Sequence, residues 1–213
     1  MPADPSRPRV RMSADQRRRQ VLEAATALIA EHGYRGLAVQ DVADACGLTL
    51  GGLLHHFGSK SGLLTAVLAH RDEQDQRSLA EHLGAAAHPE PPADADARDD
   101  LPEPTLAQLC EAIVRRNAGQ REIVRLYAVL EVESLAPEHP AHRFFAERQR
   151  RTLDHLTRLA PPGPDGRDLA RHVLALMDGL QVQWLRDPDV DLVTAWRRTA
   201  QQVPHLAGGR DGG

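Results

Sequence analysis

A tight turn between two short helices constrains this chain more than any other feature. The spacing of apolar residues predicts one helix from about Val39 to Cys46, because residues three and four apart share a helix face. Gly47 ends that helix, and the Thr49 hydroxyl can cap a second helix that runs through Phe57. Two short helices joined by a turn that contains glycine are typical of a helix-turn-helix unit.

Helices are also predicted on both sides of this pair. Ser13 and Gln16 form a capping box at the start of the preceding helix, and Gly33 ends that helix. Its apolar stripe consists of Val21, Leu22, Ala25, Leu28 and Ile29. The following helix begins near Lys60 and is wholly polar over residues 71–78, which indicates a solvated connector.

Patterning divides the chain into six predicted segments. They are a disordered basic tail (1–12), the helix-turn-helix domain (13–58), a connecting helix (59–84), a linker rich in Pro, Ala and Asp (85–104), a helical body (105–206) and a disordered tail (207–213). Within the body, a second capping box joins Thr105 and Gln108. Further helices are predicted at 121–135, 140–159, 167–185 and 191–203. No stretch alternates apolar and polar residues as strands do, so we expect an all-α fold.

Composition excludes several classes of protein. The 213 residues are 41% hydrophobic, but no apolar run approaches the ~20 residues of a membrane span, and no secretory signal is visible. Cys46 and Cys110 cannot form a disulfide framework, and their spacing does not suggest zinc. The sequence also lacks a glycine-rich phosphate loop and a nucleophile elbow, so we expect no enzyme activity and no cofactor. These features predict a soluble cytoplasmic protein.

Charge is distributed unevenly along the chain, whose net charge is −4. Residues 1–70 carry eight basic and six acidic groups, whereas the remainder carries 18 basic and 24 acidic groups. A basic front on an acidic body suits a head that binds a polyanion. All of the basic groups are arginines except Lys60.

Residues 33–68 resemble the N-terminal DNA-binding domain of the tetracycline-repressor (TetR) family. The matching residues are Gly33, Tyr34, Val42, Ala43, Cys46, Gly47, Leu48, Thr49, Gly51, Leu53, His56, Phe57, Ser59 and Lys60. Residues 135–142 and 177–185 are similar to the subgroup of choline- and betaine-responsive (BetI-like) regulators. The resemblance implies a three-helix DNA-binding domain followed by a helical ligand-binding and dimerisation domain. It also implies a homodimeric repressor that a small-molecule ligand releases from an inverted-repeat operator on double-stranded DNA.

The second helix of the pair, from Thr49 to Phe57, corresponds to the recognition helix of the family. Its residues and those around it are the candidate DNA contacts. They are Arg17, Arg18, Gln40, Thr49, Leu50, Gly51, Gly52, Leu54, His55, His56 and Lys60. Leu50 has no hydrogen-bonding group, so its expected partner is a thymine methyl. The resemblance assigns a phosphate contact to Lys60, at a helix N-terminus that already attracts anions.

The recognition helix departs from the family pattern. Gly52 stands where the family usually has Ser or Thr, and Leu54 where it usually has Tyr. Ala38 replaces the Ser or Thr that commonly caps the preceding helix. These changes remove polar contacts, so the two histidines, Gln40 and the arginines at 17–19 must carry more of the binding. Adjacent glycines cost a helix about 1 kcal/mol each, which indicates either close approach of the backbone to a partner or tight packing against the preceding helix.

The body supplies candidates for a pocket and an interface. An apolar stripe fits either an ordinary core or a subunit boundary, and the resemblance favours the boundary. The interface candidates are Leu169, Val173, Leu176, Leu180, Trp184 and Trp196. The pocket candidates are Tyr127, Glu131, His142, Phe144, Phe145, Met177 and Trp184, with Glu133 as a further polar member. His139 and His142 lack a third ligand, so no metal site is predicted.

Two alternatives remain open at the level of sequence. A helical adaptor that binds protein through a degenerate head is compatible with the acidic linker and with the losses at Gly52 and Leu54. Within the regulator class, the sequence does not distinguish an activator from a repressor.

Overall fold

The all-α prediction is confirmed by a computed structural model, which describes residues 12–87, 103–203 and 206. These residues contain α-helices and no strand. The helices are α1 (Ala14–Gly36), α2 (Val39–Ala45), α3 (Leu50–Phe57), α4 (Lys60–Ala87), α5 (Leu106–Ala118), α6 (Arg121–Glu133), α7 (His142–Leu159), α8 (Gly166–Arg186) and α9 (Leu192–Ala200). The predicted tails, apart from Met12, and most of the predicted linker lie outside the described residues.

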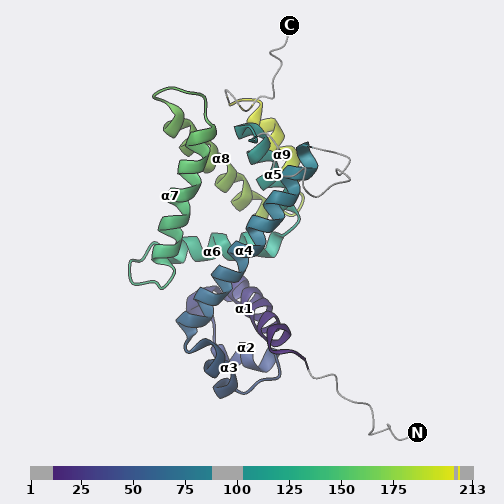
Figure 1. Ribbon diagram of the computed structural model, residues 1–213, viewed down its shortest axis with the longest axis vertical. Coiled ribbons are helices and arrows are strands. Elements are labelled where there is room, and N and C mark those ends of the chain that lie inside the picture. The colour runs from purple at the N-terminus through teal and green to yellow at the C-terminus, as the bar shows by residue number, and fades with distance from the viewer. Residues whose placement is uncertain (1–11, 88–102, 204–205, 207–213) are drawn as a thin grey trace, which may run out of the picture.

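The head of the molecule is formed by α1, α2 and α3, and the body by α5 to α9 (Figure 1). The long helix α4 runs from the head into the body, while α6 lies across the junction between them. Both predicted capping boxes are present: the Gln16 amide donates to Ser13 Oγ at 3.1 Å and the Gln108 amide to Thr105 Oγ1 at 3.2 Å. Gly47 adopts a φ of 64° in the turn between α2 and α3, a conformation that favours glycine.

The core of the head is completed by the body. Leu53 of α3 and Val42 of α2 are fully buried in it, as the sequence predicts. The same cluster also contains Leu126 and Leu130, which are both 0% exposed and both lie on α6, and Phe145 from α7. Because burial of large apolar side chains is the main source of stability, the head depends on α6 as well as on its own helices.

A carboxylate at the end of α6 holds the end of α1. Glu133 Oε2 accepts a hydrogen bond from the Tyr34 amide at 2.7 Å, and Oε1 accepts one from the Arg35 amide at 3.4 Å. Gly33 breaks α1 here with a φ of 71°, after which the helix resumes as far as Gly36. The long helical segment therefore ends at Gly33 as predicted, although a short helical stretch follows as far as Gly36. Glu133 lies at this junction instead of in a pocket. We call this arrangement the Glu133 clasp.

The polar middle of α4 is solvated on one side only: Glu73, Gln76 and Arg77 are exposed, whereas the opposite side is packed. Asp75 is only 6% exposed, and its Oδ1 lies 3.3 Å from Arg71 Nη2 in an ion pair. Gln120 Nε2 donates to the same oxygen at 3.4 Å, and Arg116 Nη1 donates to the Asp75 carbonyl at 3.2 Å. The stretch looks polar because α4 packs against α5 through a buried polar network. The partners from α5 and Gln120 lie 41 and 45 positions from Asp75, too far apart in sequence to be recognised.

Two glycine substitutions separate the cost of backbone strain from the loss of the Glu133 clasp. An alanine Cβ at Gly33 would lie 2.6 Å from Glu133 Oε1, whereas one at Gly47 would meet nothing within 4 Å. We expect Gly47→Ala to lower the free energy of unfolding by about 1–2 kcal/mol through backbone strain alone. Gly33→Ala should lower it by about 2–4 kcal/mol, because it also displaces the carboxylate from its two amide donors. Urea denaturation measures both values, and equal losses would contradict a stabilising clasp.

Charge removal at Asp75 tests the α4–α5 network. Asp75→Asn leaves the buried guanidinium of Arg71 without its counter-charge, so we expect the free energy of unfolding to fall by about 3 kcal/mol in urea denaturation. Asp72→Asn is the matched control on the same helix. Asp72 is 22% exposed and makes only long ion pairs, at 3.7 and 3.9 Å, so its loss should stay below about 1 kcal/mol. Similar values for the two variants would rule out a structural role for the network.

Candidate DNA-binding surface and ligand pocket

The short helix α3 presents an apolar side to the head and a second side to solvent. Leu53 and Phe57 are buried against the helices around them. Leu50, His55 and His56 are exposed, and Leu50 is one of the few large apolar side chains in the described residues with this much exposure. A solvent-facing leucine beside two histidines leaves both apolar and hydrogen-bonding groups free for a partner. Their contact with DNA stays a prediction.

The two adjacent glycines do not pack against α2. A Cβ on Gly51 would meet nothing within 4 Å, and one on Gly52 would meet only Thr49 Oγ1, at 3.1 Å. That oxygen caps α3 by accepting a hydrogen bond from the Gly52 amide at 3.1 Å. Of the two explanations offered for the glycines, packing against the preceding helix is therefore wrong. Leu54, which replaces the usual Tyr, is half-buried.

The candidate polar contacts around α3 are held to the head by interactions of their own. Arg17 Nη1 donates to the Cys46 carbonyl at 3.3 Å, and the Arg18 guanidinium lies 5.1 Å from the centre of the Phe57 ring. Gln40 donates to a carboxylate one turn further along α2, at 2.6 Å. These three side chains are thus held against the head by contacts of their own.

Lys60, at the start of α4, lies beside the Glu133 clasp. Its Nζ lies 4.7 Å from the centre of the Tyr34 ring and donates to the Arg35 carbonyl at 3.3 Å. The amides of these same two residues donate to Glu133. A displacement of the clasp would therefore also disturb the lysine that the sequence predicts as a phosphate contact.

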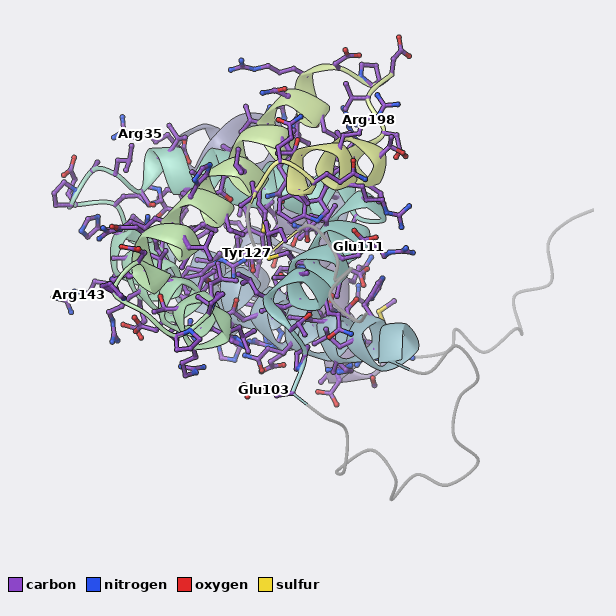
Figure 2. The ribbon with its side chains drawn as sticks, turned by 90° about the horizontal axis from the view of Figure 1, so that it is seen from above. Arg35, Glu103, Glu111, Tyr127, Arg143 and Arg198 are labelled. Carbon is purple, nitrogen blue, oxygen red and sulfur yellow. The ribbon has the colours of Figure 1, made fainter. Side chains whose placement is uncertain are left out.

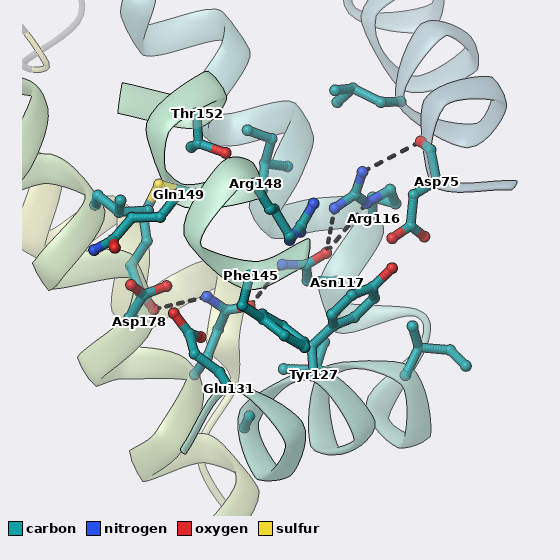
Figure 3. A pocket seen from close by; sticks show the side chains of 18 of the residues that line it. Asp75, Arg116, Asn117, Tyr127, Glu131, Phe145, Arg148, Gln149, Thr152 and Asp178 are labelled. Carbon is teal, nitrogen blue, oxygen red and sulfur yellow. Dashed lines mark hydrogen bonds between the residues drawn. The ribbon is translucent and has the colours of Figure 1, made fainter. Parts of the chain in front are cut away.

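A cavity of about 470 Å³ lies in the body, between α4, α5, α6, α7 and α8 (Figure 3). Four of the seven predicted pocket residues line it: Tyr127, Glu131, Phe145 and Met177. Tyr127 lies inside the molecule, whereas Arg143 and Arg198 lie at its periphery (Figure 2). A volume of this size, lined by apolar side chains and a few polar ones, is typical of small-molecule sites.

The other three predicted pocket residues do not line the cavity. His142 Nδ1 lies 2.8 Å from the Ser134 carbonyl, in a hydrogen bond at the start of α7. Phe144 packs against the core of the head, and Trp184 is buried in the core of the body. The aromatic side chains misled the prediction because their size and spacing suit a core as well as a pocket.

Sequence reasoning missed most of the polar lining of the cavity. The additional polar residues include Asp75, Arg116, Asn117, Gln120, Arg148, Gln149 and Asp178. Burial lowers the pKa of Arg116, and its guanidinium donates to Asn117 Oδ1 at 3.0 and 3.2 Å. Asp178 directly follows an inward-facing methionine on α8, and that acid beside an apolar stripe was the one signal available in the sequence.

The predicted interface stripe is divided between two environments. Val173, Trp184 and Trp196 are at most 6% exposed in a single chain, so they belong to its core and leave no surface for a partner. Leu169, Leu176 and Leu180 are half-buried and keep part of their surface. The stripe is divided because α8 packs against α7 and α9, which enclose one side of the helix.

None of the helices in the described part of the chain is long and apolar enough to cross a membrane.

Comparisons with known proteins agree with this architecture. The family profile described as bacterial regulatory proteins of the tetR family matches residues 21–67, which cover most of α1 and extend into α4. The repressor KstR2 of Mycobacterium tuberculosis is 42% identical over 60 residues, which are 28% of this chain and only 30% of KstR2. The regulator BetI of Stenotrophomonas maltophilia is 32% identical over 176 residues, which are 80% of each chain.

Solved structures show the same fold. A transcriptional regulator from Saccharomonospora viridis, solved in complex with choline, has a TM-score of 0.65 at 23% identity and covers 87% of this chain and 93% of its own. With the BetI alignment across four-fifths of both sequences, these similarities establish that the chain belongs to the tetR family of bacterial transcriptional regulators.

Proposed function

We propose that this protein is a homodimeric repressor that binds an inverted-repeat operator and leaves it when a small molecule occupies the cavity. The alignment with BetI, which extends through both head and body, carries the proposal. The exposed face of α3 supports DNA binding, because helix-turn-helix proteins insert the start of their second helix into the major groove. The cavity between α4 and α8 supports a response to a ligand.

The proposed dimer would use the side of α8 that faces solvent. Ala175 and Gly179 are exposed on this side, and Leu176 is half-buried beside them. A Cβ on Gly179 would meet nothing within 4 Å, so a second helix can approach closely there. A two-fold dimer would place its recognition helices about 34 Å apart, or a multiple of that distance, which fits an inverted repeat.

Coupling between the cavity and the head would run through α6. Tyr127 and Glu131 of this helix line the cavity, and Glu133 at its end forms the clasp on α1. A ligand that binds one position of α6 better than another would shift the dimer toward that position. The operator affinity would fall if the preferred position spaces the recognition helices wrongly.

A gel-shift titration on the intergenic DNA beside the protein's own gene tests this function. We expect a specific shift that weakens steeply with salt, because phosphate binding releases counterions, and footprinting should then locate the inverted repeat. Weak, non-specific binding to that DNA at both low and high salt would contradict the proposal and favour a helical adaptor.

Lys60 and His55 should affect operator binding differently. Lys60→Ala should weaken binding to all sequences about equally and reduce the salt slope by about 1, as expected for one lost phosphate contact. His55→Ala should instead change the preference among base pairs of the operator, because its side chain projects from the exposed face of α3. A loss that is confined to particular base pairs in Lys60→Ala would exclude the phosphate role. Circular dichroism melting checks that both variants fold.

Glu133 should influence DNA binding without lying on the DNA-binding face. Glu133→Ala removes the hydrogen bonds to Tyr34 and Arg35, so the head is less firmly oriented and the operator affinity should change by several-fold. Glu122→Ala is the matched control, since Glu122 is exposed in the first turn of the same helix. Equal operator affinities for the two variants in the gel shift would argue against coupling through α6.

A further inference from the structure

Two carboxylates lie together in the cavity without partners among the residues that the structure describes. Glu131 projects from α6 and Asp178 from α8, and both are directed into the same end of the pocket (Figure 3). Neither side chain makes a hydrogen bond or an ion pair with another described residue. Both residues are exposed to the solvent that fills the pocket. Two like charges side by side with free oxygens favour a bound positive charge at this end of the cavity.

The remaining charges of the cavity are already engaged. Asp75 pairs with Arg71, and Arg116 donates to the backbone of Asp75 and to an amide on α5. The Arg148 guanidinium lies 3.9 Å from the Asp72 carboxylate and 4.7 Å from the centre of the Tyr127 ring. Glu131 and Asp178 therefore leave a local negative charge at the α6–α8 end of the cavity.

The electrostatics of Asp178 agree with this picture. Burial in the pocket and, second to it, the negative charge of Glu131 together raise its pKa to about 6, while Arg148 acts in the opposite direction. The side chain is nevertheless open to the solvent that fills the pocket. A bound cation would lower this pKa again, because an opposite charge favours the ionised carboxylate.

The aromatic residues of the cavity do not form an open cage. Arg148 covers one face of the Tyr127 ring, and the Phe145 ring packs edge-on against Tyr127 and Phe144, with centroids 6.0 and 5.2 Å apart. Cages of free aromatic faces are the usual receptors for quaternary ammonium groups. Free carboxylate oxygens instead favour a cation with N–H donors, because each oxygen can accept a hydrogen bond.

A metal ion fits this end of the cavity less well. Within the described residues, no group of three or more His, Cys, Asp or Glu side chains is assembled to hold a metal. Tyr127 also lines the cavity, and its buried hydroxyl has no hydrogen-bond partner in the described part of the chain. A buried polar atom left unsatisfied is costly, so this hydroxyl independently points to a ligand that fills the cavity and offers it a polar atom or an ordered water.

We propose that the cavity binds an amine or amidine in its protonated form, with the N–H donors held between Glu131 and Asp178 and an apolar body extending toward Tyr127. This inference rests on the proposed function in taking the cavity as the ligand site. The ligand class is thus a lipophilic cation that carries N–H groups, as distinct from an anion or a quaternary ammonium ion.

A matched set of alkyl probes separates these classes. Octylammonium, octyltrimethylammonium and octanoate share one apolar chain and differ only in the head group. Isothermal titration calorimetry with the full chain should give octylammonium an affinity at least about tenfold higher than that of either other probe. Equal or tighter binding of octyltrimethylammonium or octanoate would overturn the proposal, as would the absence of octylammonium binding at millimolar concentration.

Charge-removing variants locate the binding site. Asp178→Asn and Glu131→Gln should each weaken octylammonium binding by about tenfold. The same substitutions outside the cavity, Asp168→Asn on α8 and Glu122→Gln on α6, should leave it unchanged. Unchanged binding in both cavity variants, or equal losses in the controls, would show that the amine binds elsewhere and would refute the assignment.

The pH dependence supplies a second readout. Octylammonium should bind more weakly at about pH 5 than at about pH 8, because protonation of Asp178 removes one of the two negative charges. Glu131 and Arg148 are the other charged groups that act on Asp178, and His155 lines the same cavity. A higher affinity at the lower pH would contradict recognition by carboxylates.

Because these titrations contain no DNA, their outcome is independent of the repressor function. An amine that binds the cavity without releasing the operator would support the ligand class and contradict the proposed response. A protein that binds its operator but ignores all amines would retain the regulatory function and lose the ligand class.

Discussion

The packing of α6 against α1 is the contact on which the rest of the molecule depends. Leu126 and Leu130 are completely buried in the core of the head, although they belong to a helix of the body. The same helix lines the cavity with Tyr127 and Glu131. One rigid element therefore has an apolar side in the head and a polar side in the pocket. Packed interiors shift between discrete arrangements and do not deform smoothly. A change of position in such an element can therefore pass from the cavity to the head.

Local signals in the sequence predicted most of the fold. The capping boxes at Ser13 and Thr105, the Thr49 cap and the glycine turn at Gly47 all lie where their residue types place them. Each of these signals depends on neighbours within four residues, so one sequence is enough to read it. The resemblance to the tetR family depended on the same short-range features.

The interactions that join head to body could not be predicted in this way. Glu133 and the Tyr34 amide are 99 positions apart, and Arg116 and the Asp75 carbonyl are 41 positions apart. A glutamate at the end of an amphipathic helix has the same local pattern whether it faces solvent, a pocket or another backbone. Likewise, the stripe that contains Val173 and Trp184 has the same periodicity in a core as in an interface. Only the tertiary arrangement distinguishes these cases.

The arginine-rich composition of the chain has a chemical consequence at the recognition surface. Lys60 is the only lysine in the sequence, so it carries the only side-chain primary amine, and that amine lies over Tyr34 beside the start of α4. Reagents that acylate amines would therefore modify one side chain, at the position where the head meets its proposed phosphate. The protein thus carries a natural attachment point for a reporter group next to the recognition helix.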